Sequence, residues 1–220
     1  TLVALGCRAC ALLLHPMTKF YPLEVMEVRR ETADSVSIRF QVPAGAESAF
    51  AFKAGQYLTL EHTIGGAAVR RSYSLCAAPE DGELRVAVKE VPGGVFSTFA
   101  NRTLQVGDVL QGMVPQGRFV LEADAGLSRS FVGMAAGSGI TPILSQIRHL
   151  LHNEPQSQFT LFYVNKTSAS ILFKEQLQDL KDTFLERFRL FHLLTREPVE
   201  AELFHGRLDA ERCRALIAAK

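Results

Sequence analysis

The sequence predicts an antiparallel β-barrel or sandwich followed by a parallel α/β domain, and three observations support this fold class. Residues 20–122 consist of short alternating segments divided by glycine and proline, as in antiparallel sheets. From about residue 124, apolar runs alternate with segments of helical periodicity, as in parallel sheets. The 220 residues, 47% apolar and 21% charged, are enough to form two such cores.

The first half of the sequence predicts five or six β-strands in which apolar and polar residues alternate. Turn signals such as Gly65-Gly66 and Pro92-Gly93-Gly94 separate these strands. Residues 95–104 are the exception, because their apolar residues recur at the spacing of a short helix. The expected strands cover residues 21–32, 34–43, 55–64, 69–78 and 82–91.

The second half predicts three strands that alternate with three helices. Residues 130–136, SFVGMAA, form a continuous apolar run, which is typical of a strand buried on both faces. Further strands are expected at residues 159–164 and 188–195. This order predicts a Rossmann-like, doubly wound parallel sheet, with the domains at residues 18–124 and 125–220. The expected helices cover residues 141–151, 170–184 and 208–219.

Charge and hydropathy exclude two classes of partner. The net charge of +1 provides no field that would attract nucleic acid or an anionic membrane. No segment reaches the length needed to span a bilayer, so we expect a cytoplasmic protein without nucleic-acid or membrane partners. Residues 1–17 are read as a leader, either a segment ahead of a natural start at Met17 or the core of a signal peptide.

The four cysteines are too few and too scattered for a disulfide framework. Cys7 and Cys10 form a C-x-x-C pair that has no second half and no nearby histidine. An accidental pair is therefore favoured over metal or redox chemistry, and we expect no metal site in this chain. The other two cysteines are Cys76 and Cys213.

The stretch VRRSYSLC, residues 69–76, combines strand composition with an unusual set of side chains. Alternation directs Arg71 and Tyr73 to one face, and Ser72 and Ser74 to the other. A cation next to an aromatic ring is suited to a flat ligand that carries phosphate. The alternative is an ordinary surface cation–π pair.

Two glycine-rich turns precede predicted helices, where backbone N–H groups can receive phosphate oxygens. AAGSGITP, residues 135–142, follows a buried strand, and the Thr141 hydroxyl is a candidate for the same phosphate cradle. GGVFSTFAN, residues 93–101, offers N–H groups near Gly94 and the hydroxyl of Ser97. For each turn the alternative is a tight connection in which small residues serve packing.

These three motifs, in this order, resemble those of the ferredoxin–NADP reductase superfamily, and most of all the reductase subunits of phenylacetyl-CoA epoxidase-type oxygenases. The resemblance covers residues 18–215 and implies a FAD-binding barrel followed by an NAD(P)-binding domain. It implies that Arg71 pairs with the FAD pyrophosphate, that Tyr73 packs on the flavin, and that Ser74 lies near the reactive flavin N5. Tyr73 and Ser74 are therefore the catalytic candidates. The other cofactor-binding residues that it implies are Ser72, Val88, Lys89, Val91, Gly93, Gly94, Val95, Phe96, Ser97, Gly137, Gly139, Thr141 and Pro142.

The segment after the second α/β strand bears on the choice between NADPH and NADH. An acidic residue there would accept the ribose 2′-hydroxyl, whereas a cation suits a 2′-phosphate. This chain has Lys166 at that place and resembles NADPH-preferring relatives, so we expect NADP(H), with NAD(H) as the alternative. A solvated loop lysine is the other interpretation.

The resemblance implies an FAD-dependent NAD(P)H oxidoreductase that passes electrons to an oxygenase or to a ferredoxin-type acceptor. The family continues with a C-G-P-type strand and, in oxygenase reductases, with a [2Fe–2S] domain, and neither motif occurs here. We therefore expect an N-terminal fragment, with the [2Fe–2S] centre in an absent C-terminal domain. The alternatives are a stand-alone ferredoxin or flavodoxin reductase, and a flavin-binding electron-transfer subunit that does not react with NAD(P)H.

Overall fold

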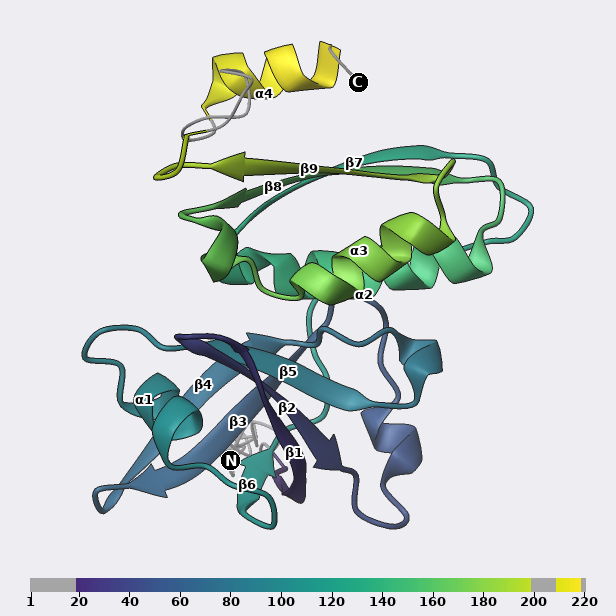
Figure 1. The fold of residues 1–220 in the computed structure, drawn as a ribbon. Helices are drawn as coiled ribbons and strands as arrows, with labels where there is room; N and C mark the ends of the chain where they lie inside the picture. The colour runs from purple at the N-terminus through teal and green to yellow at the C-terminus, as the bar shows by residue number, and fades with distance from the viewer. Residues whose placement is uncertain (1–18, 199–208, 219–220) are drawn as a thin grey trace, which may run out of the picture.

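The protein consists of a β-sheet domain and an α/β domain stacked on each other (Figure 1). The computed structural model describes residues 19–198 and 209–218, so the leader expected at residues 1–17 lies outside the described residues. In these two ranges, none of the helices is both long and apolar enough to cross a bilayer. The boundary expected at residue 124 falls within the connection between the last strand of the first sheet and the first strand of the second.

The first domain is a six-stranded antiparallel sheet that closes into a barrel. Its strands follow the order β4-β3-β6-β1-β2-β5. The sheet closes beyond β4, where Cys76 donates its N–H to Arg85 O at 3.0 Å and Leu75 bridges Val86. The sequence left open a barrel or a sandwich, and this closure makes it a barrel. The strands are β1 (Tyr21–Thr32), β2 (Ser35–Gln41), β3 (Tyr57–Ile64), β4 (Ala67–Ser74), β5 (Leu84–Lys89) and β6 (Val109–Gly112).

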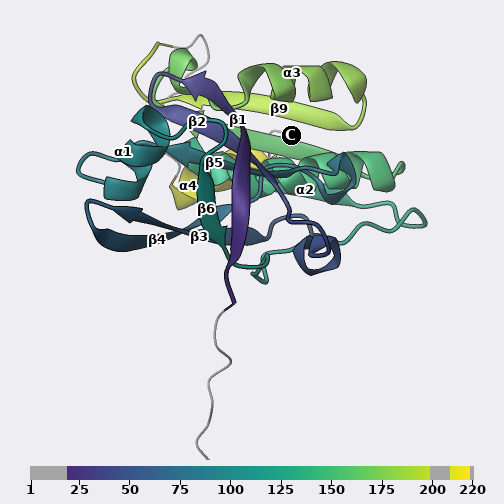
Figure 2. The same cartoon turned by 90° about the horizontal axis from the view of Figure 1, so that it is seen from below.

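Alternating apolar residues of these strands fill the barrel, as the period of two requires. Leu23, Ile38, Leu58 and Leu110 are completely buried in it. Helix α1 (Val95–Arg102) packs against β3, β4 and β5 (Figure 2) and adds Phe96 to this core. The short 3₁₀ turns η1 (Glu47–Phe50) and η2 (Pro79–Asp81) lie in the connections.

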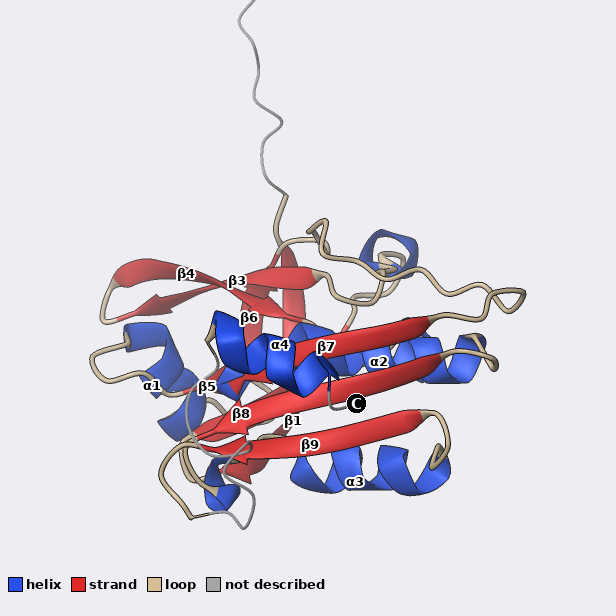
Figure 3. Ribbon diagram, turned by 90° about the horizontal axis from the view of Figure 1, so that it is seen from above, coloured by secondary structure: helices blue, strands red, loops and turns tan. Residues whose placement is uncertain are grey.

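The second domain is a parallel sheet with helices on both faces. Strands β7 (Ser130–Ala136), β8 (Gln158–Asn165) and β9 (Phe188–Leu194) lie in the order β7-β8-β9 (Figure 3). Helices α2 (Ile140–Asn153) and α3 (Lys174–Thr183) cover the face nearer the barrel, and α4 (Ala210–Ala218) covers the other (Figure 1). The expected doubly wound arrangement is therefore confirmed.

Two expectations for this domain were wrong in part. Strand β7 has the predicted bounds, but it is not buried on both faces: only Ala135 is fully buried, because β7 is the edge strand of the described sheet. The central strand β8 is the one that is almost completely enclosed. Helix α3 begins at Lys174 rather than near residue 170, because Phe173 has a left-handed backbone (φ +57°) that cannot continue a right-handed helix. The turn η4 (Ser168–Ser170) occupies the preceding positions.

Helix α2 is the main contact between the two domains. Ser145 is completely buried and donates its hydroxyl to Ala77 O at 2.7 Å. Arg148 forms an ion pair with Asp81 of η2 at 2.7 Å. The middle of α2 is thereby held against the barrel, at the connection that follows β4. This contact determines where the glycine-rich turn before α2 lies relative to the barrel.

Candidate functional site

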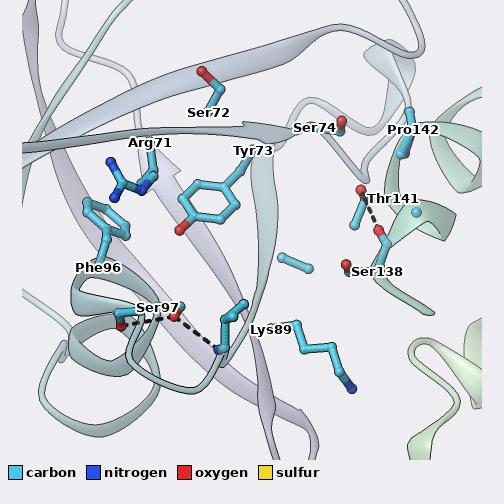
Figure 4. A pocket seen from close by; sticks show the side chains of 14 residues that line it. Arg71, Ser72, Tyr73, Ser74, Lys89, Phe96, Ser97, Ser138, Thr141 and Pro142 are labelled. Carbon is cyan, nitrogen blue, oxygen red and sulfur yellow. Dashed lines mark hydrogen bonds between the residues drawn. The ribbon is translucent and has the colours of Figure 1, made fainter. Parts of the chain in front are cut away.

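A cavity of about 560 Å³ lies between the two domains and collects residues from both (Figure 4). The barrel contributes the end of β4, the end of β5 and the loop into α1. The α/β domain contributes the turn η3 (Gly137–Gly139) and the first turn of α2. Its lining consists of Arg71, Ser72, Tyr73, Ser74, Ala87, Lys89, Val91, Gly94, Phe96, Ser97, Ser138, Gly139, Thr141 and Pro142. The three motifs singled out in the sequence therefore meet in this first cavity.

Strand β4 divides its charged residues between two faces, as its alternation predicts. Arg70 donates through Nε and Nη2 to Glu61 on β3, at 3.0 and 2.8 Å. Arg71 lines the first cavity, and among the described residues its guanidinium donates only to the carbonyl oxygen of Arg70, at 2.7 Å. No acidic residue in the described ranges pairs with Arg71. A guanidinium without a counter-charge is suited to binding an anion in two-point fashion.

Tyr73 presents an aromatic ring to the first cavity (Figure 4). The ring is half-buried and lies 5.6 Å from the Phe96 ring between centroids. Burial raises the pKa of Tyr73 to about 12, although the charge of Arg71 lowers it. The phenol is therefore neutral at physiological pH and offers a flat, uncharged face. Ser74, at the end of β4, lies on the side of the cavity that Thr141 and Pro142 form (Figure 4).

Ser72 points to the opposite face of β4 (Figure 4). Its hydroxyl shares a hydrogen bond of 2.9 Å with the hydroxyl of Thr59 on β3. Ser72 therefore borders the first cavity without offering a free hydroxyl to it.

In the loop before α1, the hydroxyl of Ser97 is used by the loop itself, which leaves the first backbone N–H groups of α1 as donors for a ligand. Ser97 Oγ accepts from the N–H of Val91 and donates to Gly94 O, both at 3.1 Å, so this hydroxyl closes the loop. The first N–H groups of α1 have no partner within the helix and carry the positive end of its dipole. A Cβ at Gly94 would lie 2.4 Å from Ser97 Oγ, which leaves room only for glycine.

A hydroxyl in the first turn of α2 is used in a similar way by the preceding turn η3. Thr141 Oγ1 donates to Ser138 O at 3.1 Å and is buried, so the turn itself engages the hydroxyl expected in the phosphate cradle. Gly137 has a left-handed backbone (φ +50°), which favours glycine. The Tyr163 hydroxyl donates to Gly137 O at 3.0 Å and holds the turn on the sheet.

A second cavity, of about 440 Å³, lies at the carboxyl ends of all three parallel strands. Ligands of open α/β sheets bind at this edge. The cavity is lined by Lys89, Ala136, Gly137, Val164, Asn165, Lys166, Ser170, Thr195 and Arg196. Lys89 also lines the first cavity, and its ammonium pairs with Asp34 at 2.9 Å. The turn η3 borders both spaces, with Gly137 in the second and Ser138 and Gly139 in the first.

Two exposed cations lie next to each other in the second cavity. Arg196 donates its backbone N–H to Lys166 O at 2.9 Å, just beyond the ends of β9 and β8. Within the described residues, neither side chain has an ion-pair or hydrogen-bond partner. The acid that follows them, Glu197, is engaged by the backbone N–H and the hydroxyl of Ser168, at 3.0 and 3.3 Å. In this part of the described chain, Glu197 therefore forms no ion pair with Lys166 or Arg196.

The residues expected to bind cofactors fall into three groups. Most line the first cavity, whereas Gly137 and Lys166 line the second. Val88, Gly93 and Val95 line neither. The Val88 side chain is buried in the barrel core and its carbonyl accepts from Asn101 at 3.0 Å, whereas Val95 is exposed. Their expected roles stay predictions.

Several lining residues were not predicted from the sequence, namely Ala87, Ala136, Ser138, Val164, Asn165, Ser170, Thr195 and Arg196. Arg196 could have been found, because the segment Thr195-Arg196 follows a predicted parallel strand in the same way that Asn165-Lys166 follows the preceding one. The same rule places Asn165 at the edge where ligands bind.

The residues of the first cavity are suited to a FAD molecule. Those of the second cavity are suited to the phosphorylated end of a nicotinamide dinucleotide. A diphosphate requires an unpaired guanidinium and free N–H groups, which Arg71 and the start of α1 provide. A flavin requires a flat face, which Tyr73 offers. The second cavity combines a glycine turn with two unpaired cations, a donor set suited to a phosphorylated nucleotide.

Two family models match the chain, one for each domain. The model described as an oxidoreductase FAD-binding domain matches residues 22–121. The model described as an oxidoreductase NAD-binding domain matches residues 134–218. The first range contains the barrel, and the second begins in β7.

Curated relatives agree with both matches. The chain is 43% identical over 203 residues to a subunit of the 1,2-phenylacetyl-CoA epoxidase of Escherichia coli, and the match covers 92% of this chain and 57% of that protein. It is 36% identical over 186 residues to the ferredoxin reductase component of 3-ketosteroid-9-alpha-monooxygenase of Mycobacterium tuberculosis, and this match covers 78% of this chain and 49% of that protein. The chain thus spans about half the length of these relatives.

Solved structures share the fold at lower sequence identity. A ferredoxin NADP+ reductase from Neisseria gonorrhoeae with bound FAD and NADP aligns with a TM-score of 0.73 at 21% identity, covering 90% of this chain and 76% of that one. The cytochrome b5 reductase domain of Ulva prolifera nitrate reductase gives a TM-score of 0.75 at 22% identity, covering 90% and 81%. These alignments confirm the expected fold class, and the family models and curated relatives confirm the expected superfamily. The chain belongs to the FAD-binding and NAD-binding oxidoreductases, and its relatives include the reductase components of oxygenases.

Proposed function

We propose that this chain is the FAD-dependent reductase part of an electron-transfer system, with FAD in the first cavity and NADPH as its preferred electron donor. The observation that carries the proposal is the junction of the two cavities. Lys89 lines both, and the turn η3 contributes to both. A dinucleotide that lies over Gly137 and passes Ser138 would bring its nicotinamide end into the first cavity, beside Tyr73 and Ser74.

FAD, when bound, supplies the hydride acceptor and can release its electrons one at a time. The chain provides binding and orientation. Arg71 neutralises the diphosphate, and the N–H groups at the start of α1 bind its oxygens. Tyr73 packs against the ring system as a neutral phenol. Ser74 places a small hydroxyl at the side of the cavity where η3 and α2 approach, which leaves space for the nicotinamide.

The preference for NADPH rests on the charges at the second cavity. Lys166 and Arg196 are unpaired cations on adjacent strand ends, as a 2′-phosphate requires. NADH is usually held by an acid that accepts the ribose 2′-hydroxyl. The acid nearest in sequence to this rim, Glu197, already accepts two hydrogen bonds from Ser168.

We also propose that the electrons pass to an oxygenase or a ferredoxin-type acceptor through an iron–sulfur centre. The support is the similarity to an epoxidase subunit and to a monooxygenase ferredoxin reductase component. A stand-alone ferredoxin or flavodoxin reductase is the alternative within the same chemistry. The cytoplasmic location stays a prediction.

Stopped-flow absorption under anaerobic conditions tests the proposed donor. The FAD-loaded chain is mixed with NADPH or NADH at equal concentrations, and the loss of the oxidised flavin bands is followed. We expect both nucleotides to bleach the flavin, and NADPH to do so at the higher second-order rate. Equal rates contradict the NADPH preference. Absence of bleaching by either nucleotide identifies a flavin-binding subunit that does not react with NAD(P)H.

A further inference from the structure

The Tyr163 hydroxyl is a polar group in the interior of the α/β domain. Tyr163 lies in the central strand β8, and its side chain is completely buried. The hydroxyl donates to Gly137 O at 3.0 Å, a carbonyl that is 26 residues away in the chain. A phenylalanine would bury the same ring without a polar group, as Phe159 and Phe162 of the same strand do. The hydroxyl is therefore explained by its partners rather than by the packing of the ring.

Two further groups act on this hydroxyl. Burial raises the pKa of Tyr163, and the Asn165 side chain and the backbone of Leu172 oppose this rise as hydrogen-bonding groups. Asn165 ends β8, and Leu172 lies between η4 and α3. The phenol is therefore protonated and can donate to Gly137 O. One hydroxyl thus joins the end of β8, the turn η3 and the segment before α3.

The carbonyl that accepts from Tyr163 controls the turn η3. Gly137 O also accepts from the N–H of Ile140, which closes the turn. A peptide unit is planar and trans, so its C=O and N–H point in opposite directions. Because Gly137 O is directed at the Tyr163 hydroxyl, the N–H of Ser138 is directed away from it. The hydroxyl therefore fixes the peptide group that links Gly137, in the second cavity, to Ser138, in the first.

We propose that Tyr163 is a positioning residue for hydride transfer, which acts through the peptide group between Gly137 and Ser138. In the proposed function, the dinucleotide passes over this peptide group on its way from the second cavity to the first. Tyr163 lines neither cavity, so it acts through the turn rather than by touching either cofactor. This role rests on the proposed function.

The variant Tyr163→Phe removes the hydroxyl and retains the ring. Stopped-flow bleaching of the FAD-loaded chain at increasing NADPH concentrations separates the limiting rate from the half-saturating concentration. We expect the limiting rate to fall roughly three- to tenfold, which is the scale of one neutral hydrogen bond. The half-saturating concentration and the dissociation constant of FAD should change little, because Lys166, Arg196 and Arg71 remain in place. An unchanged limiting rate would overturn the proposal.

The residue Ser157 provides a matched control for loss of stability. Its hydroxyl is also completely buried, and it accepts from the N–H of Arg129 at 2.6 Å. It precedes β8, at the opposite end of the strand from the two cavities. We expect Ser157→Ala to lower the temperature of thermal unfolding at least as much as Tyr163→Phe does, and to keep the limiting rate of the parent chain. Equal losses of limiting rate in both variants would mean that the Tyr163 hydroxyl only stabilises the domain, which would overturn its positioning role.

Hydrogen exchange of the ligand-free chain, followed by NMR, tests the turn without either cofactor. The N–H of Ile140 reports on η3, because it donates to Gly137 O. We expect this N–H to exchange roughly three- to tenfold faster in Tyr163→Phe, since the turn loses one of its hydrogen bonds. The amides that pair β7 with β8 should exchange as in the parent chain. An unchanged exchange rate at Ile140 would show that the hydroxyl does not hold the turn, and the proposal would fail.

The same experiments distinguish this inference from the proposed function. If NADPH does not bleach the flavin of the parent chain, the proposed function fails, and the role of Tyr163 in hydride transfer fails with it. If the parent chain is bleached and Tyr163→Phe is bleached at the same limiting rate, only the role of Tyr163 fails.

Discussion

The backbone N–H of Arg196 donates to the carbonyl oxygen of Lys166 at 2.9 Å. This hydrogen bond continues the pairing of β9 with β8 and holds two cationic residues next to each other at the edge of the sheet where ligands bind. The two residues line one cavity from adjacent strand ends, and their side chains lack ion-pair partners among the described residues. A phosphate group with two negative charges would pair with both cations.

Replacement of either cation should therefore affect one nucleotide only. We expect Lys166→Ala and Arg196→Ala each to lower kcat/KM for NADPH about tenfold or more, since a charge-assisted contact is worth roughly 1.5–3 kcal/mol. NADH should be almost unaffected. Steady-state kinetics with both nucleotides check this. Lys174→Ala is a suitable control, because Lys174 lies at the start of α3 and outside the second cavity. Equal losses with NADPH and NADH would show that these residues do not bind a 2′-phosphate.

The neighbouring residues Arg70 and Arg71 allow a matched comparison of FAD binding. Arg71→Ala should raise the dissociation constant of FAD by at least tenfold, because it removes a charge-assisted contact worth roughly 1.5–3 kcal/mol. Arg70→Ala should change it little, since Arg70 faces Glu61 in an exposed ion pair of the kind that contributes at most about 1 kcal/mol to folding. Quenching of flavin fluorescence on binding measures both constants. If the two variants retain FAD equally well, Arg71 does not contact the diphosphate.

The glycine at the start of α1 is a third test of the first cavity. The added Cβ of Gly94→Ala would lie 2.4 Å from Ser97 Oγ and 3.0 Å from Val91 O, so the loop must shift. We expect FAD affinity to fall at least tenfold while the barrel still folds, on the scale of losing one or two hydrogen bonds. Gly126→Ala, where a Cβ comes no closer than 3.4 Å to Asp124, is the control. Unchanged FAD affinity in Gly94→Ala would mean that this loop does not bind the cofactor.

Acid stability should depend on a buried carboxylate at the end of α2. The Arg129 guanidinium, which donates to Glu154 at 2.7 Å, holds the pKa of that carboxyl at about 2, against a usual 4.5, despite burial. The unfolded chain therefore binds the proton more readily. The stabilisation is complete above pH 4.5 and is lost as the pH falls toward 2.

Glu154→Gln should consequently lower the free energy of unfolding at pH 7 by about 1–3 kcal/mol, the cost of leaving buried partners imperfectly paired. The difference from the parent should shrink between pH 4.5 and 2. Urea unfolding at pH 7 and pH 3 measures it. Glu122→Gln serves as the control, because that carboxylate is mostly exposed in its pair with Lys53. If Glu154→Gln lowers the free energy of unfolding by the same amount at both pH values, the lowered pKa assigned to Glu154 is contradicted.

Local patterns were sufficient to predict most of the elements. The alternation in residues 21–32 and the apolar run at residues 130–136 correspond to β1 and β7 with the predicted bounds. What local pattern could not predict was the position of a strand in its sheet. β7 is as apolar as a central strand, yet it lies at the edge of the described sheet. The start of α3 was also missed, because Phe173 is buried with a left-handed backbone that its residue type does not favour.

The motifs of the candidate site could be predicted from the sequence. The way in which their residues are divided between two cavities could not. The sequence treated Gly137 and Gly139 as one phosphate cradle, whereas the turn lies between two cavities. It also assigned the Thr141 hydroxyl to a ligand, although that group bonds within its own turn. The division between the cavities depends on how α2 docks on the barrel through Ser145, whose partner Ala77 is 68 residues away in the chain, whereas the Thr141 hydrogen bond spans only three residues. Arg196 becomes significant only because β9 pairs with β8.

The most direct test of the central claim is the visible absorption spectrum of the FAD-reconstituted chain under anaerobic conditions, before and after one equivalent of NADPH. If the two adjoining cavities bind FAD and the nucleotide as proposed, the oxidised flavin bands will be present at first and will bleach promptly on addition. Bound flavin that stays oxidised would contradict the proposed contact between the cavities. A chain that binds no flavin would contradict the assignment of the first cavity itself.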